Sequence, residues 1–217
     1  LHKAIRRQRQ MCIRDRNKPG DDTTIATVKI VSRKNVCLYS GPPMDKSCDE
    51  RLVTEFMIPE GKKIVCGGSS ANIVSRVLKQ PLMPSIEYSD PEIPPTATIA
   101  GIDLVTEGVI TLKRTVDILK SYVENPTGKE VLASLDLKNG ASQIAKMLIE
   151  DCTHLYLYIG QSINPAHQNP DLPFDLSIKM IILDELYSLM IKLGKVVKRY
   201  YCLLYTSPSP RDISGSR

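Results

Sequence analysis

The sequence contains no tryptophan and two phenylalanines. Proteins that bind single-stranded nucleic acid stack bases on aromatic side chains, so this scarcity argues against such a surface, although nine tyrosines remain. The chain also lacks an apolar run of the length that a membrane span needs. We therefore expect a globular cytoplasmic protein that binds neither nucleic acid nor membrane.

The six cysteines form no C-x-x-C pair and no regular framework. Cys37, Cys66 and Cys152 fall in or beside apolar runs, where a free cysteine behaves as a small core residue. A metal or disulfide role is the less favoured alternative. This usage is typical of reduced cysteines in a cytoplasmic protein.

The net charge of +5 is carried by the ends of the chain. Residues 1–16 hold six basic residues and one acid, and residues 202–217 hold two and one, which leaves a net charge of −1 for residues 17–201. Neither end shows helical or strand periodicity, and both resemble peptides translated from sequencing-adapter DNA. We interpret them as artefact tails, with the natural protein extending upstream of Asn17. The alternative is a basic arm and a Ser/Pro-rich tail.

One stretch, KKIVCGGSSANIVSR at residues 62–76, predicts a short buried strand, a tight turn at Gly67-Gly68 and a helix. Ser69 and Ser70 stand where a helix N-cap belongs, with unpaired N–H groups facing outward. The pattern suggests an anion cradle, but it lacks the lysine of a P-loop and the spacing of G-x-G-x-x-G. A turn that merely redirects the chain is an equal alternative.

Beyond Asn35, strands alternate with helices, which predicts an α/β fold with a mostly parallel open sheet and flanking helices. Five prolines exclude a long helix in residues 81–99, where we expect an excursion with a short strand near 86–88. The expected strands are 36–40, 64–66, 102–105, 154–159 and 196–201. The main expected helices are 45–57, one that starts after Gly68 and includes Leu78, 109–123, 141–151 and 176–193.

Four of these strands end in loops with special residues: Gly41-Pro42-Pro43, Gly67 to Ser70, Thr106 to Gly108, and Asn164 to Asp171. In a parallel sheet such loops meet at one edge, which is the usual ligand site. The convergence predicts a ligand-binding site made of Gly67, Gly68, Ser69, Ser70, Thr106, Glu107, Gly108, Asn164 and His167.

Two residues of this set are candidates for chemistry. His167 lies in a polar loop, where it is either a general base or phosphate contact, or a hydrogen-bond donor that staples the loop. Glu107 either contacts a ligand hydroxyl or a metal, or is a solvated carboxylate favoured by the dipole of the following helix.

Near the N-terminus, residues 17–31 read NKPGDDTTIATVKIV, a turn followed by a strand. From physics alone this is a charged turn capping an edge strand. K-P-G-D-D-T-T before a β-run nevertheless resembles the closing motif of the type 2C (PPM) class of metal-dependent Ser/Thr protein phosphatases, in particular the bacterial SpoIIE-like branch. The resemblance implies that Asp21, with Asp22 beside it, helps hold the Mg²⁺ or Mn²⁺ that activates water.

This resemblance covers residues 17–31 alone, and the upstream metal-binding acids of the family are missing. It implies the last strand of a truncated phosphatase domain, inactive by itself, whose parent acts on a phosphoprotein. Residues 36–201 would then be a regulatory α/β domain that binds a small anionic ligand or a partner. The alternative is an independent phospholigand-binding module, or a small enzyme that uses Glu107 and His167.

Overall fold

The computed structural model describes residues 30–85, 93–161 and 178–201. Contacts within the chain divide it into two units, residues 1–32 and 33–217. The second unit holds all the helices and strands described below. Residues 17–29 of the phosphatase-like stretch and the predicted strand near 86–88 lie outside the described residues.

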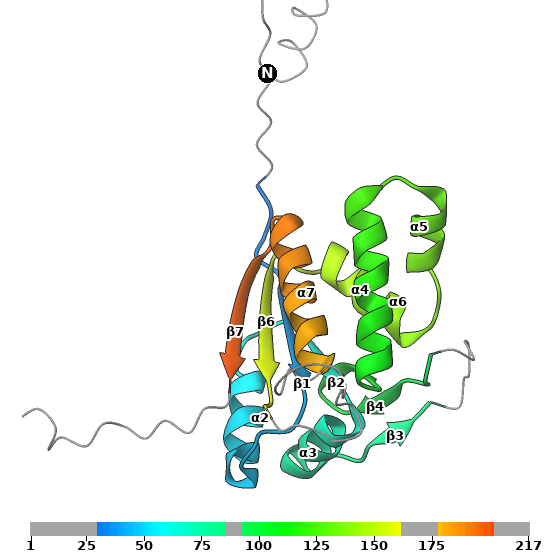
Figure 1. The fold of residues 1–217 in the computed structure, drawn as a ribbon. Coiled ribbons are helices and arrows are strands. Elements are labelled where there is room, and N and C mark those ends of the chain that lie inside the picture. The colour runs from blue at the N-terminus through cyan, green and yellow to red at the C-terminus, as the bar shows by residue number, and fades with distance from the viewer. Residues whose placement is uncertain (1–29, 86–92, 162–177, 202–217) are drawn as a thin grey trace, which may run out of the picture. The chain divides into compact units, whose positions relative to one another are not determined.

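The described strands form one seven-stranded sheet in the order β3-β4-β5-β2-β1-β6-β7 (Figure 1). The strands from β5 to β7 in this order are parallel, whereas β3 and β4 pair antiparallel at one edge. The α/β prediction with a mostly parallel sheet is therefore confirmed. The strands are β1 (Asn35–Ser40), β2 (Lys62–Cys66), β3 (Met83–Pro84), β4 (Ala97–Ile99), β5 (Ile102–Thr106), β6 (His154–Ile159) and β7 (Val196–Tyr201).

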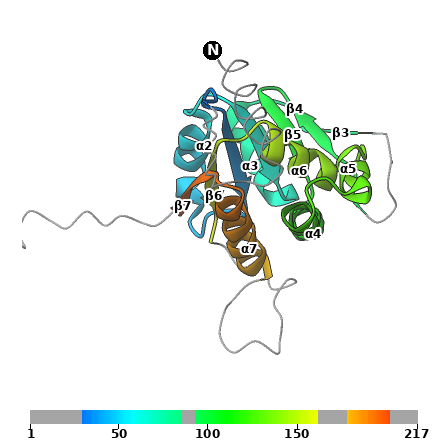
Figure 2. The same ribbon diagram turned by 90° about the horizontal axis from the view of Figure 1, so that it is seen from above.

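Helices connect the parallel strands and cover both faces of the sheet (Figures 1 and 2). Buried side chains of α2 and α3 pack on one face, and those of α4, α6 and α7 pack on the other. The helical elements are the 3-10 turn η1 (Lys46–Cys48), α2 (Asp49–Met57), α3 (Gly68–Leu78), α4 (Val109–Glu124), α5 (Lys129–Leu135), α6 (Gly140–Glu150) and α7 (Ile178–Lys192).

The two faces of the sheet differ in the side chains that fill them. The core under α4, α6 and α7 is mainly aliphatic. The core under α2 and α3 contains aromatic rings, with Phe56 of α2 packed between Tyr39 of β1 and Tyr158 of β6. Because both faces are covered, the central strands β1 and β6 are apolar along most of their length.

The chain runs from β1 outward to β2 and β5, and then returns to the other side of β1 as β6. The direction of winding therefore reverses between β1 and β6. In open α/β sheets this reversal opens a crevice at the carboxyl ends of the two strands, where ligands commonly bind. The topology therefore marks that edge of the sheet as the candidate site.

Candidate functional site

The carboxyl ends of β1, β2, β5 and β6 lie at one edge of the sheet, because these strands are parallel and adjacent. Each is followed by a glycine within two residues, and we call the edge with these four glycines the rim. The glycines are Gly41, Gly67, Gly108 and Gly160. Three of the loops that the sequence predicted to converge, those beginning at Gly41, Gly67 and Thr106, start at these neighbouring strand ends, and the fourth, residues 164–171, lies outside the described residues. The four glycines of the rim form two pairs with different geometry.

Gly41 and Gly160 form a closed corner at the reversal of the winding. A Cβ atom on Gly160 would lie 2.1 Å from the carbonyl oxygen of Gly41 and 2.2 Å from that of Pro42. Lys179 of α7 also contacts this corner, since its Nζ donates a hydrogen bond of 2.7 Å to the carbonyl oxygen of Gly160. Burial lowers the pKa of Lys179. Main chain of the loop after β1 therefore packs directly against Gly160 at the reversal of the winding, beside which doubly wound folds commonly bind a ligand.

Gly67 and Gly108 form an open corner. The N–H of Gly67 donates to the carbonyl oxygen of Thr106 over 2.9 Å, and Gly67 has a φ of 114°, a conformation that favours glycine. A Cβ atom on Gly108 would lie 3.5 Å from the Cα of Gly67, which is ordinary contact. These glycines are the N-cap residues of α3 and α4, so two helices of 11 and 16 residues begin beside each other.

The N-cap of helix α3 lies two to three residues earlier than the sequence suggested. Gly67, and neither serine, is its N-cap, so Ser69 and Ser70 lie within the first turn. Ser70 is fully buried, and its Oγ accepts a hydrogen bond of 2.8 Å from the N–H of Gly41. Ser70, in the first turn after the open corner, is therefore hydrogen-bonded to Gly41 of the closed corner. Ser69 is exposed.

Thr106, the last residue of β5, and Glu107, which follows it, lie in opposite environments. Thr106 is buried, and its Oγ1 donates to Cys66 Sγ over 3.6 Å and to the main-chain oxygen of Glu107 over 3.0 Å. Glu107 is exposed, and its Oε1 lies 3.8 Å from the position that a Cβ on Gly68 would take. The carboxylate thus stands at the first turn of α3, where the helix dipole favours negative charge.

The other predicted site residues lie outside the described part of the chain. These are Asn164 and His167 in the loop after β6, and Asp21 and Asp22, the predicted ligands of Mg²⁺ or Mn²⁺. Within residues 30–85, 93–161 and 178–201, no group of three or more histidine, cysteine or acidic side chains is placed to bind a metal ion. Sequence reasoning missed Lys179, which carries no motif and reaches the rim through the packing of α7.

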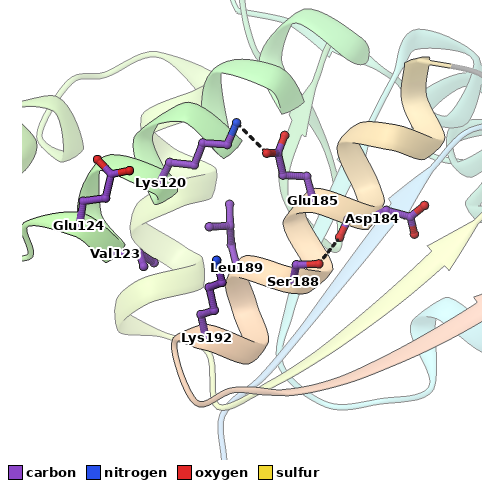
Figure 3. Close-up of a pocket in the computed structure, with 8 residues that line it drawn as sticks. All are labelled: Lys120, Val123, Glu124, Asp184, Glu185, Ser188, Leu189 and Lys192. Carbon is purple, nitrogen blue, oxygen red and sulfur yellow. Dashed lines mark hydrogen bonds and ion pairs between the residues drawn. The ribbon is translucent and has the colours of Figure 1, made fainter.

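Away from the rim, a concavity of about 540 Å³, called the second concavity below, lies between α4 and α7 (Figure 3). Its charged groups are partly paired, since Lys120 Nζ contacts Glu185 Oε1 at 2.7 Å. It involves the end of α4 that is remote from the rim, because α4 starts at the rim with Val109. The lining residues are Lys120, Val123, Glu124, Asp184, Glu185, Ser188, Leu189 and Lys192.

Among the residues described, no helix combines the length and the apolar character that crossing a membrane requires. Comparison of the chain with protein-family models, curated proteins and solved structures found no match.

Proposed function

We propose that the α/β domain is a regulatory domain that binds a small anionic ligand at the open corner of the rim. The observation that carries this proposal is the meeting of two helix N-termini at Gly67 and Gly108. The first N–H groups of a helix have no acceptor within the helix. Both N-caps are glycines, so no capping side chain covers those groups.

The electrostatics of this corner favour a ligand with negative charge. Each helix N-terminus carries the equivalent of about half a positive charge, and two of them lie together here. Glycine backbone permits close approach by a phosphate or carboxylate group. The exposed hydroxyl of Ser69, in the first turn of α3, adds a hydrogen-bond donor.

The carboxylate of Glu107 favours an anionic ligand that also carries hydroxyl groups over a simple anion. This carboxylate, close to Gly68, repels a free anion but accepts hydrogen bonds from hydroxyl groups. A ligand that combines an anionic group with neighbouring hydroxyls, such as a sugar phosphate, suits both features. The regulatory role is proposed from the resemblance of residues 18–24 to a phosphatase motif, with ligand occupancy acting on the phosphoprotein phosphatase activity of the parent.

The test is isothermal titration calorimetry of the full chain with orthophosphate and with ribose 5-phosphate. Glu107→Gln removes the repelling charge, and we expect it to tighten orthophosphate binding up to about fivefold, the range for an exposed charge pair. The same variant is expected to weaken ribose 5-phosphate binding, because the amide has half the acceptor oxygens of the carboxylate.

Glu124→Gln provides the matched control, since Glu124 lies at the far end of α4 beside the second concavity. It should leave both affinities unchanged. The proposal fails if the wild-type chain binds neither compound, or if the two Glu→Gln variants behave alike.

A further inference from the structure

Cys37 and Lys63 form a buried pair that the rim does not use. They are direct partners in the register of β1 and β2, so the backbone itself places the two side chains opposite each other. Cys37 is 0% exposed and Lys63 is 5% exposed. Lys63 Nζ donates a hydrogen bond of 3.3 Å to Cys37 Sγ.

The described residues around Lys63 Nζ supply no negative charge. It also donates to the carbonyl oxygen of Pro59 and lies 5.5 Å from the centre of the Phe56 ring. Asp103 bonds instead to the main-chain N–H of Lys63 and pairs with Lys62. No described carboxylate lies within ion-pair distance of Lys63 Nζ. Burial of a lysine side chain without a counterion is costly, so the contact between Lys63 and sulfur calls for an explanation.

We propose that Cys37 and Lys63 are a modification site at which hydrogen peroxide forms a covalent bond between Sγ and Nζ. In the first step sulfur attacks the peroxide, an S–O bond forms, the O–O bond breaks, and the thiol proton leaves with hydroxide as water. The product is a sulfenic acid, and sulfur has lost two electrons to the peroxide.

In the second step the amine of Lys63, after releasing one proton to solvent, attacks the same sulfur. The S–N bond forms and the S–O bond breaks, and the hydroxyl group leaves as a second water with a proton from nitrogen. Condensation of a sulfenic acid with nitrogen to a sulfenamide is established cysteine chemistry. No further oxidant is consumed, and the product joins β1 to β2.

Two equally buried cysteines lack this arrangement and serve as internal references. Cys66 accepts a hydrogen bond from Thr106, and Lys195 reaches the main-chain oxygen of Cys152 over 2.6 Å. Burial raises the pKa of the Cys37 thiol, while Lys63 lowers it. Burial outweighs the effect of Lys63 on this pKa, so Cys37 differs from the other two cysteines in having an amine in contact with its sulfur. That amine can condense with a sulfenic acid once one forms at Cys37.

The test exposes the full chain to hydrogen peroxide and follows its intact mass and its peptide map. We expect a mass decrease of about 2 Da, for two hydrogen atoms, and a linked pair of peptides containing Cys37 and Lys63. Treatment with dithiothreitol should restore the original mass. Cys66 and Cys152 should remain unmodified under the same conditions.

Lys63→Met keeps an unbranched stem but removes the amine, and it should abolish the linked peptides. Lys62→Met makes the same change at the adjacent, half-exposed position and should leave the crosslink intact. Linked peptides that persist in Lys63→Met, or a wild-type chain that gains only oxygen at Cys37, would overturn the proposal. Peptide mapping of the wild-type chain decides the matter even if Lys63→Met does not fold.

Discussion

The closed and open corners of the rim look alike in the sequence and differ in space. Both place a glycine after a buried strand, yet Gly160 is packed against the main chain of Gly41 and Pro42, whereas Gly67 and Gly108 meet at ordinary contact distance. At the closed corner glycine is needed because another backbone fills the place of a side chain. At the open corner it leaves two helix N-termini uncovered.

The difference shows that a glycine after a strand indicates that another group comes close to the backbone. The sequence does not say whether that group is main chain of the same protein or a ligand. The closed corner lies at the reversal of winding, where ligands commonly bind in this fold. There the molecule contacts itself. The proposed binding site is one strand removed from the reversal, at the ends of β2 and β5.

Gly160→Ala is expected to change the free energy of unfolding more than any other substitution that tests the difference between the two corners. The added methyl group would lie 2.1 Å from a main-chain oxygen, so the loop after β1 has to shift. We expect the free energy of unfolding to fall by about 3 kcal/mol, the upper part of the range for overpacking. Urea unfolding measures it, and a loss below about 1 kcal/mol would show that the corner is not closed.

An effect that is intermediate in size per pH unit is expected at alkaline pH, because Cys66 is opposite Ser40 in register and immediately precedes the open corner. Burial raises the pKa of Cys66 from 9.0 to about 12, and its hydrogen bond from Thr106 opposes this shift. Between pH 9.0 and about 12, the unfolded chain loses the thiol proton while the folded chain keeps it, so stability falls as pH rises. Each such group lowers the free energy of unfolding by about 1.4 kcal/mol for every unit by which the pH rises in this interval.

Cys66→Ala should therefore reduce the slope of stability against pH between pH 9.0 and about 12. Urea unfolding across this interval provides the measurement. Cys152 also has a pKa raised by burial to about 12, and it continues to contribute in the variant. An unchanged slope in Cys66→Ala would mean that the base of the open corner is accessible to solvent.

The smallest effect is expected for Gly68→Ala, the counterpart of Gly160→Ala at the open corner. The new methyl group would lie 3.8 Å from Glu107 Oε1, which is normal contact. Alanine is favoured over glycine within a helix by up to about 1 kcal/mol, so the variant should equal or slightly exceed the wild-type stability. A loss comparable with that of Gly160→Ala in the same urea experiment would contradict the distinction between the corners.

Much of the fold followed from local patterns. The alternation of strands and helices predicted the α/β class, and β6 has the predicted bounds, His154–Ile159. Its continuous apolar run fits a strand that is covered on both faces. The predicted turn at Gly67-Gly68 is also present, although α3 begins at Gly68 and the N-cap is glycine instead of serine.

The candidate site was predicted in outline and corrected in detail. Ser70 was expected to face a ligand, but it is buried and bonded to Gly41, because α3 turns this side chain toward β1. Lys179 could not be foreseen, since its position depends on how α7 packs over the sheet. The predicted roles of His167 and Asn164 stay predictions.

By itself the sequence determined which segments are strands and helices, because hydrophobic periodicity and glycine or proline breaks act over a few residues. Tertiary structure decided which glycines touch main chain, which hydroxyls are buried, and that Cys37 faces Lys63. Those facts depend on strand order and register. Packing between segments that are distant in the chain sets both, and local sequence patterns do not report that packing.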